Sequence, residues 1–289
     1  MELRMDRLTK HYGKKIAIDR FSVTLKSGVY GLLGANGAGK TTLLRMLADL
    51  LWPTAGDITF DGTSIYDLDQ EYRDLLGYLP QNFGFYPEFT AEDFMHYMAA
   101  IKGLKKSAAK EKTKELLQLV SLSANAKNKV KTFSGGMLRR LGIAQSLLND
   151  PMILILDEPT AGLDPKERIR FRNLISEIST DRIVILSTHI VSDVESIANE
   201  ILLMKDGQLL KKGSVEEIAA LADEKVWTAC VPQKEVSKLK DNCILVNIKM
   251  NGEMAELRMV ADACPIDSAV KVLPTLEDAY LYSFGEDAQ

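Results

Sequence analysis

Cysteine and histidine are scarce in this sequence, and their scarcity narrows the kinds of site that it can form. The 289 residues include three cysteines and three histidines. Cys230, Cys243 and Cys264 lie far apart in the last quarter of the chain and form no Cys-x-x-Cys pair. No metal cluster is therefore predicted, and the odd number of widely spaced cysteines favours free thiols in a reducing compartment.

Long apolar runs are also missing. No segment approaches the roughly 18 uncharged apolar residues of a membrane-spanning helix, and the N-terminal MELRMDRLTK lacks the apolar core of a signal peptide. We therefore expect a cytoplasmic protein. If it acts at a membrane, another polypeptide must supply the span.

The chain has no excess of basic residues. Lysine and arginine number 36 against 40 aspartates and glutamates, which gives a formal net charge of −4. Nucleic-acid-binding proteins usually need a clustered basic face, so this balance argues against general nucleic-acid binding. Hydrophobic residues at 46% and charged residues at 26% are ordinary for a folded globular protein, which argues against disorder.

Short apolar runs alternate with helical patterns over residues 1–221. The first thirty residues predict antiparallel strands. Met152–Leu156 is a continuous apolar run, and Arg182–Ser187 (RIVILS) is apolar between its two ends; both are typical of parallel strands covered on both faces. The predicted fold class is α/β, with a parallel core sheet, an antiparallel N-terminal β-subdomain and a helical subdomain at about 88–150.

A boundary is predicted near Leu221–Glu224. Beyond it, three strand patterns and a hairpin turn at Asn251-Gly252 indicate a small α+β extension over residues 222–289. So short a segment cannot bury a large core alone, and we expect it to pack against the main domain.

A glycine-rich segment carries the strongest chemical signal. Residues 34–41, GANGAGKT, match the pattern G-x-x-x-x-G-K-[ST] in full, between a predicted strand and a predicted helix. Glycines let backbone N–H groups surround phosphate oxygens, and the helix N-terminus favours an anion. Lys40 is expected to reach the β- and γ-phosphates and the Thr41 hydroxyl to bind Mg²⁺. Taken alone, the motif predicts a nucleoside triphosphate and leaves kinase, GTPase and ATPase open.

Two carboxylates follow the most apolar predicted strand. At this position Asp157 can hold Mg²⁺ through water, and Glu158 can polarise the attacking water. The alternative is a polar strand end without chemistry, which the phosphate loop disfavours. We find no N-K-x-D segment that would specify guanine.

A third motif connects these signals to a known family. Phe133-Ser134-Gly135-Gly136-Met137-Leu138-Arg139-Arg140 lies just upstream of ILILDEPTAGLDP. Together with Gln81 and His189, the set resembles the ATP-binding subunit of ATP-binding cassette (ABC) transporters over about residues 1–220. The resemblance implies a head-to-tail homodimer or heterodimer with two ATP molecules between the subunits, and ATP hydrolysis that drives a separate transmembrane permease. It places the chain on the inner face of the cell membrane, held there by the permease.

The resemblance implies a role for each matching residue. Glu158 would be the general base, His189 would contact the γ-phosphate, and Lys40 would offset charge on the phosphoryl group. Gln81 and Asp157 would join Thr41 at Mg²⁺. The residues expected to contact ATP, some of them on the other subunit's nucleotide, are Tyr12 (on the adenine), Gly34, Ala35, Asn36, Gly37, Ala38, Gly39, Lys40, Thr41, Thr42, Gln81, Ser134, Gly135, Gly136 and Asp164.

Several of these residues also have plain structural interpretations. Ser134 can simply cap a helix, His189 can be structural, and Tyr12 can be a packing residue. Met137 departs from the family pattern, which usually has glutamine there. We expect the sandwich to close nonetheless, because the serine and the glycine backbone groups remain.

Aromatic residues are concentrated in residues 82–97, which hold six of the chain's 20. In the family this region faces the membrane subunit, so we expect an aromatic-lined groove for a cytoplasmic helix of that partner. A local core of the helical subdomain is the alternative. The six residues are Phe83, Phe85, Tyr86, Phe89, Phe94 and Tyr97.

The tail bears on the direction of transport. Val272–Tyr280, VLPTLEDAY, resembles the C-terminal extension of ATPase subunits in a bacterial exporter subclass, the ABC-2 type, which favours export over import. Two other functions fit the sequence less well. A soluble cassette ATPase acting on ribosomes or DNA usually carries a second cassette, a coiled coil or zinc modules, and a regulatory ATP-binding module would not need both Glu158 and His189.

Overall fold

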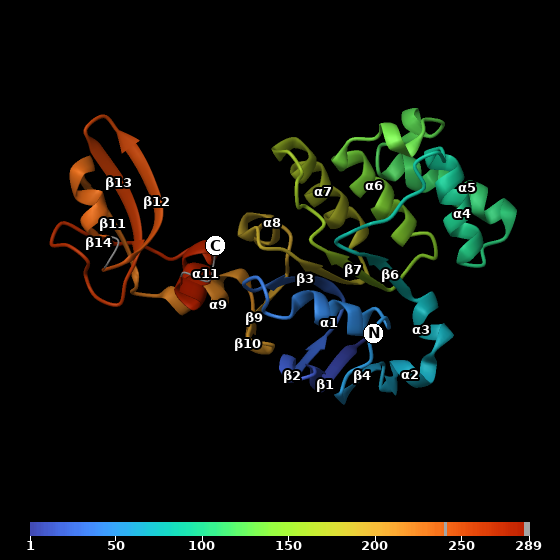
Figure 1. The fold of residues 1–289 in the computed structure, drawn as a ribbon, viewed down its shortest axis with the longest axis horizontal. Helices are drawn as coiled ribbons and strands as arrows, with labels where there is room; N and C mark the ends of the chain where they lie inside the picture. The colour runs from blue at the N-terminus through green and yellow to red at the C-terminus, as the bar shows by residue number, and fades with distance from the viewer. Residues whose placement is uncertain (240–241, 286–289) are drawn as a thin grey trace.

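The computed structural model describes residues 1–239 and 242–285, which form three β-sheets surrounded by helices (Figure 1). In spatial order, the N-terminal sheet contains β2 (Lys15–Leu25), β1 (Leu3–Tyr12), β4 (Ala55–Phe60) and β5 (Thr63–Ser64). The central sheet contains β10 (Gln208–Gly213), β9 (Glu200–Lys205), β3 (Gly28–Leu33), β8 (Ile183–Ser187), β7 (Ile153–Asp157) and β6 (Leu76–Leu79). The C-terminal sheet contains β12 (Ile244–Asn251), β13 (Met254–Val260), β11 (Val226–Pro232) and β14 (Val270–Lys271).

The central sheet is parallel except at β10, and helices or strands cover both of its faces. Along β7, Leu154 and Leu156 point into a core shared with α6 and α7, whereas Ile153 and Ile155 point into a core shared with α1 and the N-terminal sheet. Because both faces are buried, the strand needs apolar residues at every position. The predicted α/β fold class is confirmed.

Helices connect the strands and form the subdomain beyond β6. They are α1 (Lys40–Leu47), α2 (Ile65–Leu68), α3 (Gln70–Asp74), α4 (Ala91–Ile101), α5 (Lys106–Leu119), α6 (Gly135–Ser146), α7 (Pro165–Ile178), α8 (Val191–Glu195), α9 (Val215–Ala219), α10 (Val236–Leu239) and α11 (Leu276–Phe284). Short 3₁₀ turns lie at Ser123–Asn125, Val130–Thr132, Ala220–Ala222 and Gln233–Glu235. Capping explains several starts: Thr90, Ser214 and Thr275 each form a capping box at their helix. Over residues 1–239 and 242–285, no helix has the length and apolar character needed to cross a membrane.

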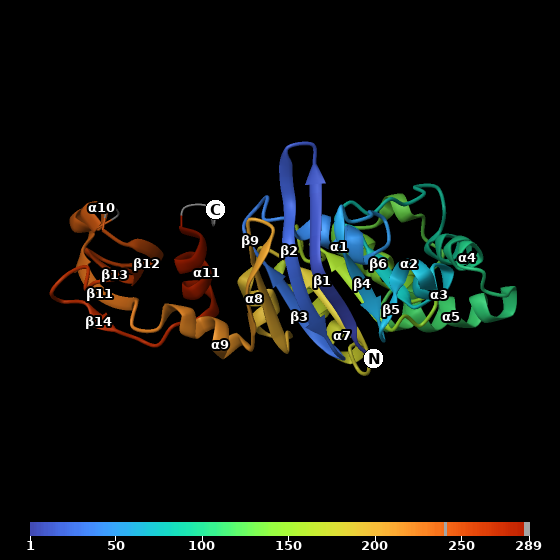
Figure 2. The ribbon, with the colours of Figure 1, turned by 90° about the horizontal axis from the view of Figure 1, so that it is seen from below.

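The C-terminal extension contributes both to small clusters of its own and to a core of the main domain. Its sheet packs around Trp227, Leu257 and Met259 in a small cluster of its own. Helix α11 instead places Tyr280 and Phe284 in the large core of the main domain. Figures 1 and 2 accordingly show the sheet standing apart, with α9 and α11 between it and the rest of the molecule. The expected packing against the main domain is thus made by α11.

Candidate active site

The glycine-rich segment forms the loop between β3 and α1, and its glycines are required by close packing. Gly39 adopts a positive φ of 104°, and a Cβ there would collide with the carbonyl oxygen of Ala17. A Cβ on Gly34 would likewise collide with the carbonyl oxygen of Met204. A side chain at either position would push the loop away from the strands that support it.

Lys40 opens α1 and is buried in the loop. Its ammonium donates hydrogen bonds to the carbonyl oxygens of Gly34 (2.6 Å) and Ala35 (3.1 Å). Burial lowers the pKa of Lys40, and the nearby charges of Glu158 and Asp157 oppose that shift. A cation is therefore held next to two carboxylates.

Asp157 ends β7 beside α1. Its Oδ1 accepts a hydrogen bond from the Ser187 hydroxyl at 2.7 Å and lies 3.4 Å from the Thr41 hydroxyl. Its Oδ2 is buried without a hydrogen-bond partner among the residues described. A hydroxyl beside an unpartnered carboxylate oxygen is the hard-oxygen chemistry that Mg²⁺ requires, so these residues fit the metal that the motif implies.

Glu158 follows with a positive φ of 49°, which is unusual for a residue with a side chain. Its carboxylate is buried, and Oε2 lies 2.9 Å from Nδ1 of His189. The structure thus brings Lys40, Asp157, Glu158 and His189 to the same edge of the central sheet, where the carboxyl ends of parallel strands meet.

Lys40 and Glu158 border a cleft of about 270 Å³. Tyr12 stands at its rim, 48% exposed, with the Lys10 ammonium 5.7 Å from its ring centroid. The exposed Gln81 follows β6 and also reaches the cleft. The lining residues are Tyr12, Lys15, Ala17, Asn36, Gly37, Gly39, Lys40, Thr41, Thr42, Gln81 and Glu158.

Four of the predicted ATP contacts lie outside both the phosphate loop and the cleft, and two of them each cap a helix. The Ser134 hydroxyl accepts the Met137 N–H at 3.3 Å and starts α6, and Asp164 accepts the Glu167 N–H at 2.9 Å and starts α7. Neither lines the 270 Å³ cleft in the described part of the chain, and Gly135 and Gly136 do not line it either. Gly135 instead borders a second hollow of about 410 Å³ together with Ala161–Leu163. One chain therefore leaves four of the fifteen predicted ATP contacts away from its phosphate loop and cleft.

Ser187 was missed by the sequence interpretation, although it contacts both acidic residues. It is fully buried at the end of β8, where its hydroxyl also accepts the Glu158 N–H at 3.0 Å. A polar residue that closes an otherwise apolar strand, Ile183–Leu186, is the signal that could have identified it.

The aromatic segment separates into core and surface. Phe94 is buried and packs edge-on against Phe83, with ring centroids 5.7 Å apart. Tyr86, Phe89 and Tyr97 form a second group with centroids 5.0–5.8 Å apart, and both tyrosines are at least 40% exposed. The local-core interpretation holds for Phe94, while the second group offers a surface.

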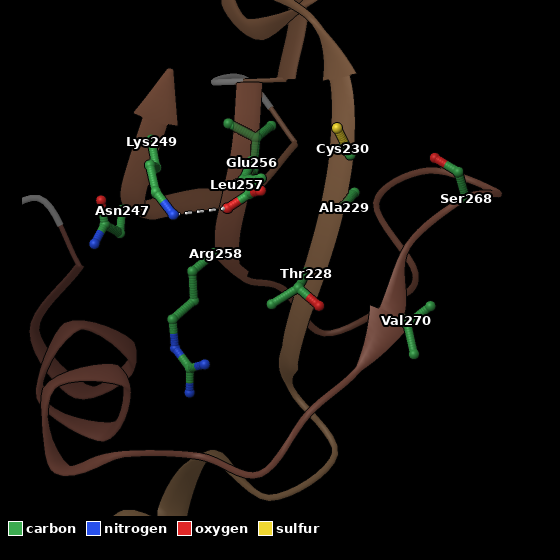
Figure 3. A pocket seen from close by; sticks show the side chains of 10 residues that line it. All are labelled: Thr228, Ala229, Cys230, Asn247, Lys249, Glu256, Leu257, Arg258, Ser268 and Val270. Atoms are coloured by element: carbon green, nitrogen blue, oxygen red, sulfur yellow. Dashed lines mark ion pairs between the residues drawn. The ribbon is translucent and has the colours of Figure 1, made fainter. Parts of the chain in front are cut away.

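A hollow of about 580 Å³ lies away from this site, on the face of the C-terminal sheet that carries Arg258 (Figure 3). Lys249 and Glu256 form an ion pair across neighbouring strands there, at 3.5 Å. The guanidinium of Arg258 points towards α11, where it pairs with Asp278. The phosphate loop and the carboxylates of the cleft do not contribute to this hollow.

Known proteins resemble the chain in both sequence and fold. A family model described as ABC transporter matches residues 18–161. The uncharacterized ABC transporter ATP-binding protein YxlF of Bacillus subtilis is 38% identical over 233 residues, which are 80% of this chain and 77% of that protein. The Nod factor export ATP-binding protein I of Ralstonia nicotianae is 34% identical over 75% of this chain and 68% of its own length. A solved dimer of the ATP-binding cassette MJ0796, in a post-hydrolysis state bound to ADP and Pi, is 25% identical with a TM-score of 0.66, covering 73% of this chain and 98% of that one. The chain therefore belongs to the ABC transporter family, among its ATP-binding subunits.

Proposed function

We propose that this chain is the ATP-hydrolysing subunit of an exporter and works as a head-to-tail pair beside a separate transmembrane permease. The observation that carries the proposal is that one chain does not bring all the predicted ATP contacts to its own cleft. Lys40 and Glu158 border the cleft, whereas Ser134 and Gly135 lie outside it. A second subunit supplies the missing contacts if its Ser134–Gly136 segment meets the nucleotide held here. The dimeric ADP-bound relative supports this arrangement.

Hydrolysis requires a base beside the γ-phosphate and positive charge around it. In our proposal Glu158 accepts a proton from the attacking water as the water oxygen bonds to phosphorus and the bond to ADP breaks. A positioned general base contributes roughly 10²–10⁴-fold in rate. His189 holds Oε2 of that base at 2.9 Å. Lys40 offsets the charge on the phosphoryl oxygens, and Mg²⁺, when bound by Thr41, Gln81 and Asp157, adds positive charge there.

The dimer closes or reopens according to whether the bound nucleotide makes more contacts in the closed or in the open state. A triphosphate gripped by both subunits stabilises the closed pair, because it makes more contacts there than in the open one. Cleavage removes the shared γ-phosphate, so the closed pair loses that difference and reopens.

Export and permease binding rest on separate observations. The Ralstonia relative is named as an export protein. The exposed Tyr86 and Tyr97, together with the half-buried Phe89, supply an aromatic surface suited to a helix of the permease. Through that contact the chain would sit on the inner face of the membrane.

The test compares full-length Glu158→Gln with the unaltered chain and with Glu177→Gln, an exposed control on α7. We expect Glu158→Gln to bind ATP, to form a stable dimer in Mg-ATP by light scattering, and to release phosphate about 10²–10⁴-fold more slowly. Glu177→Gln should behave as the unaltered chain. Near-normal phosphate release by Glu158→Gln would remove it as the base. A monomer with ATP bound would contradict the paired mechanism.

A further inference from the structure

Ser187 contacts the carboxylate of Asp157 and the backbone N–H of Glu158. Strands β7 and β8 are parallel neighbours, and Asp157 is paired with Ser187 in their register. The Ser187 hydroxyl donates to Oδ1 of Asp157 at 2.7 Å and accepts the N–H of Glu158 at 3.0 Å. One hydroxyl therefore touches both acidic residues, from a strand that neither belongs to.

The bond to Asp157 selects which carboxylate oxygen remains available. Oδ1 is held by Ser187, while Oδ2 is buried and has no hydrogen-bond partner among the described residues. Rotation about the last side-chain torsion of an aspartate is otherwise only weakly restricted. The Ser187 bond thus aims the second oxygen of Asp157 in one direction.

The bond to Glu158 fixes a strained backbone. A positive φ is unfavourable for a residue with a side chain, so neighbouring contacts must stabilise it. Both the hydroxyl and the carbonyl oxygen of Ser187 accept the Glu158 N–H. With His189 at the other end of the side chain, Glu158 is held at its backbone and at its carboxylate.

The packing of strand β8 does not by itself require a serine at position 187. The four preceding residues of β8 are apolar and buried, and an alanine or valine would complete the strand without burying a hydroxyl. We propose that Ser187 is a positioning residue for ATP hydrolysis, which orients the carboxylate of Asp157 and the backbone of Glu158. The inference rests on the roles proposed above for those two residues.

Three variants of the full chain separate the hydroxyl from its bulk. Ser187→Ala removes the hydroxyl, Ser187→Thr keeps it with an added methyl group, and Ser187→Val has the shape of threonine without the hydroxyl. Since hydrogen bonds to charged groups are worth about 1.5–3 kcal/mol, we expect kcat to fall about 10- to 100-fold in Ala and Val. Ser187→Thr should stay within about fivefold of the unaltered chain. The affinity for ADP measured without Mg²⁺ should change less than about threefold in all three. Ser146→Ala, which removes a buried hydroxyl bonded only within α6, is the control and should keep normal kcat.

Two results would overturn the inference. Equal turnover by the Thr and Val variants would show that the hydroxyl is not needed. A loss of turnover in Thr and Val that follows an equal fall in their melting temperatures would assign Ser187 to packing. Glu158→Gln, measured in parallel, distinguishes the two proposals: if it hydrolyses ATP normally, the proposed mechanism fails. If it is inactive while Ser187→Ala is normal, only the role of Ser187 fails.

Discussion

The carboxylate of Asp278 joins the C-terminal sheet to α11. It is fully buried and accepts hydrogen bonds from Nε and Nη2 of Arg258 on β13, the latter at 2.6 Å. The N–H and hydroxyl of Thr275 also donate to it, each at 2.7 Å. Asp278→Asn keeps the shape but leaves the guanidinium without its charge partner. Breaking a buried pair in this way costs about 3–5 kcal/mol, and the partial exposure of Arg258 places the expected loss near 3 kcal/mol.

The same site predicts a pH dependence. Burial raises the pKa of Asp278, but the hydrogen bonds from Arg258 and Thr275 outweigh burial and hold the pKa below its usual value of 3.8. A carboxyl group with a lowered pKa in the folded state stabilises that state above the unfolded pKa, and this stability is lost as pH falls through the folded pKa. The extension should therefore weaken below about pH 4, and Asp278→Asn should lack that part of the pH dependence.

Tryptophan fluorescence in urea measures both effects. Trp227 is buried in the C-terminal sheet, and Trp52 is 67% exposed, so a Trp52→Phe background isolates the signal of the extension. For a slope of about 1.5 kcal/mol per molar urea, a loss of about 3 kcal/mol lowers the midpoint by about 2 M. Asp262→Asn is the control, because its ion pair with Lys225 is at the surface and should contribute little, and because asparagine can still accept the Tyr282 hydroxyl. The reasoning is refuted if Asp278→Asn shifts the midpoint no further than Asp262→Asn.

Two further predictions concern the phosphate loop and the permease surface. Gly39→Ala should weaken ATP binding at least about 100-fold in titration calorimetry, because the new Cβ collides with the backbone at a residue whose φ is positive. The control is Gly103→Ala, which also has a positive φ but has open space around it, and this variant should bind ATP normally. Equal ATP affinities of the two variants would show that the loop tolerates a side chain. The double variant Tyr86→Ala, Phe89→Ala should lower permease-stimulated phosphate release several-fold while leaving basal ATP binding unchanged. The exposed control Leu210→Ala should change neither quantity. An equal loss of stimulated phosphate release and basal ATP binding in the double variant would contradict docking at this surface.

The strands that could be predicted from the sequence are those whose burial on both faces requires an unbroken run of apolar residues. Met152–Leu156 and Arg182–Ser187 correspond to β7 and β8, because strands covered on both faces need an unbroken apolar run. No prediction was made for β6, Leu76–Leu79, which is only four residues long and contains Gly77. A Cβ on that glycine would meet the backbone of α6, so the residue is explained by a tertiary contact that spacing does not encode.

The candidate site shows the same limit. Lys40, Asp157 and Glu158 lie in local motifs, so residue type and spacing were enough to select them. Ser187 lies 30 residues beyond Asp157, and its contact with the carboxylate depends on the register of two strands. The aromatic segment is similar: Phe94 and Tyr86 look alike in the sequence, and only the packing of α4 shows that one is buried and the other exposed.

The extension is attached at the part of the main domain that follows His189. Helix α8 begins two residues after that histidine, and its Val194 shares a core with Tyr280 of α11. Burial, and then the charge of Glu158, raise the pKa of Tyr280, which places α11 within electrostatic reach of the proposed base. Asp278 lies on the other side of α11 from this contact, toward the C-terminal sheet, since it pairs with β13. Asp278→Asn should therefore loosen the sheet and leave the contact between His189 and Glu158 intact, so basal hydrolysis should persist in a variant whose Trp227 transition has shifted.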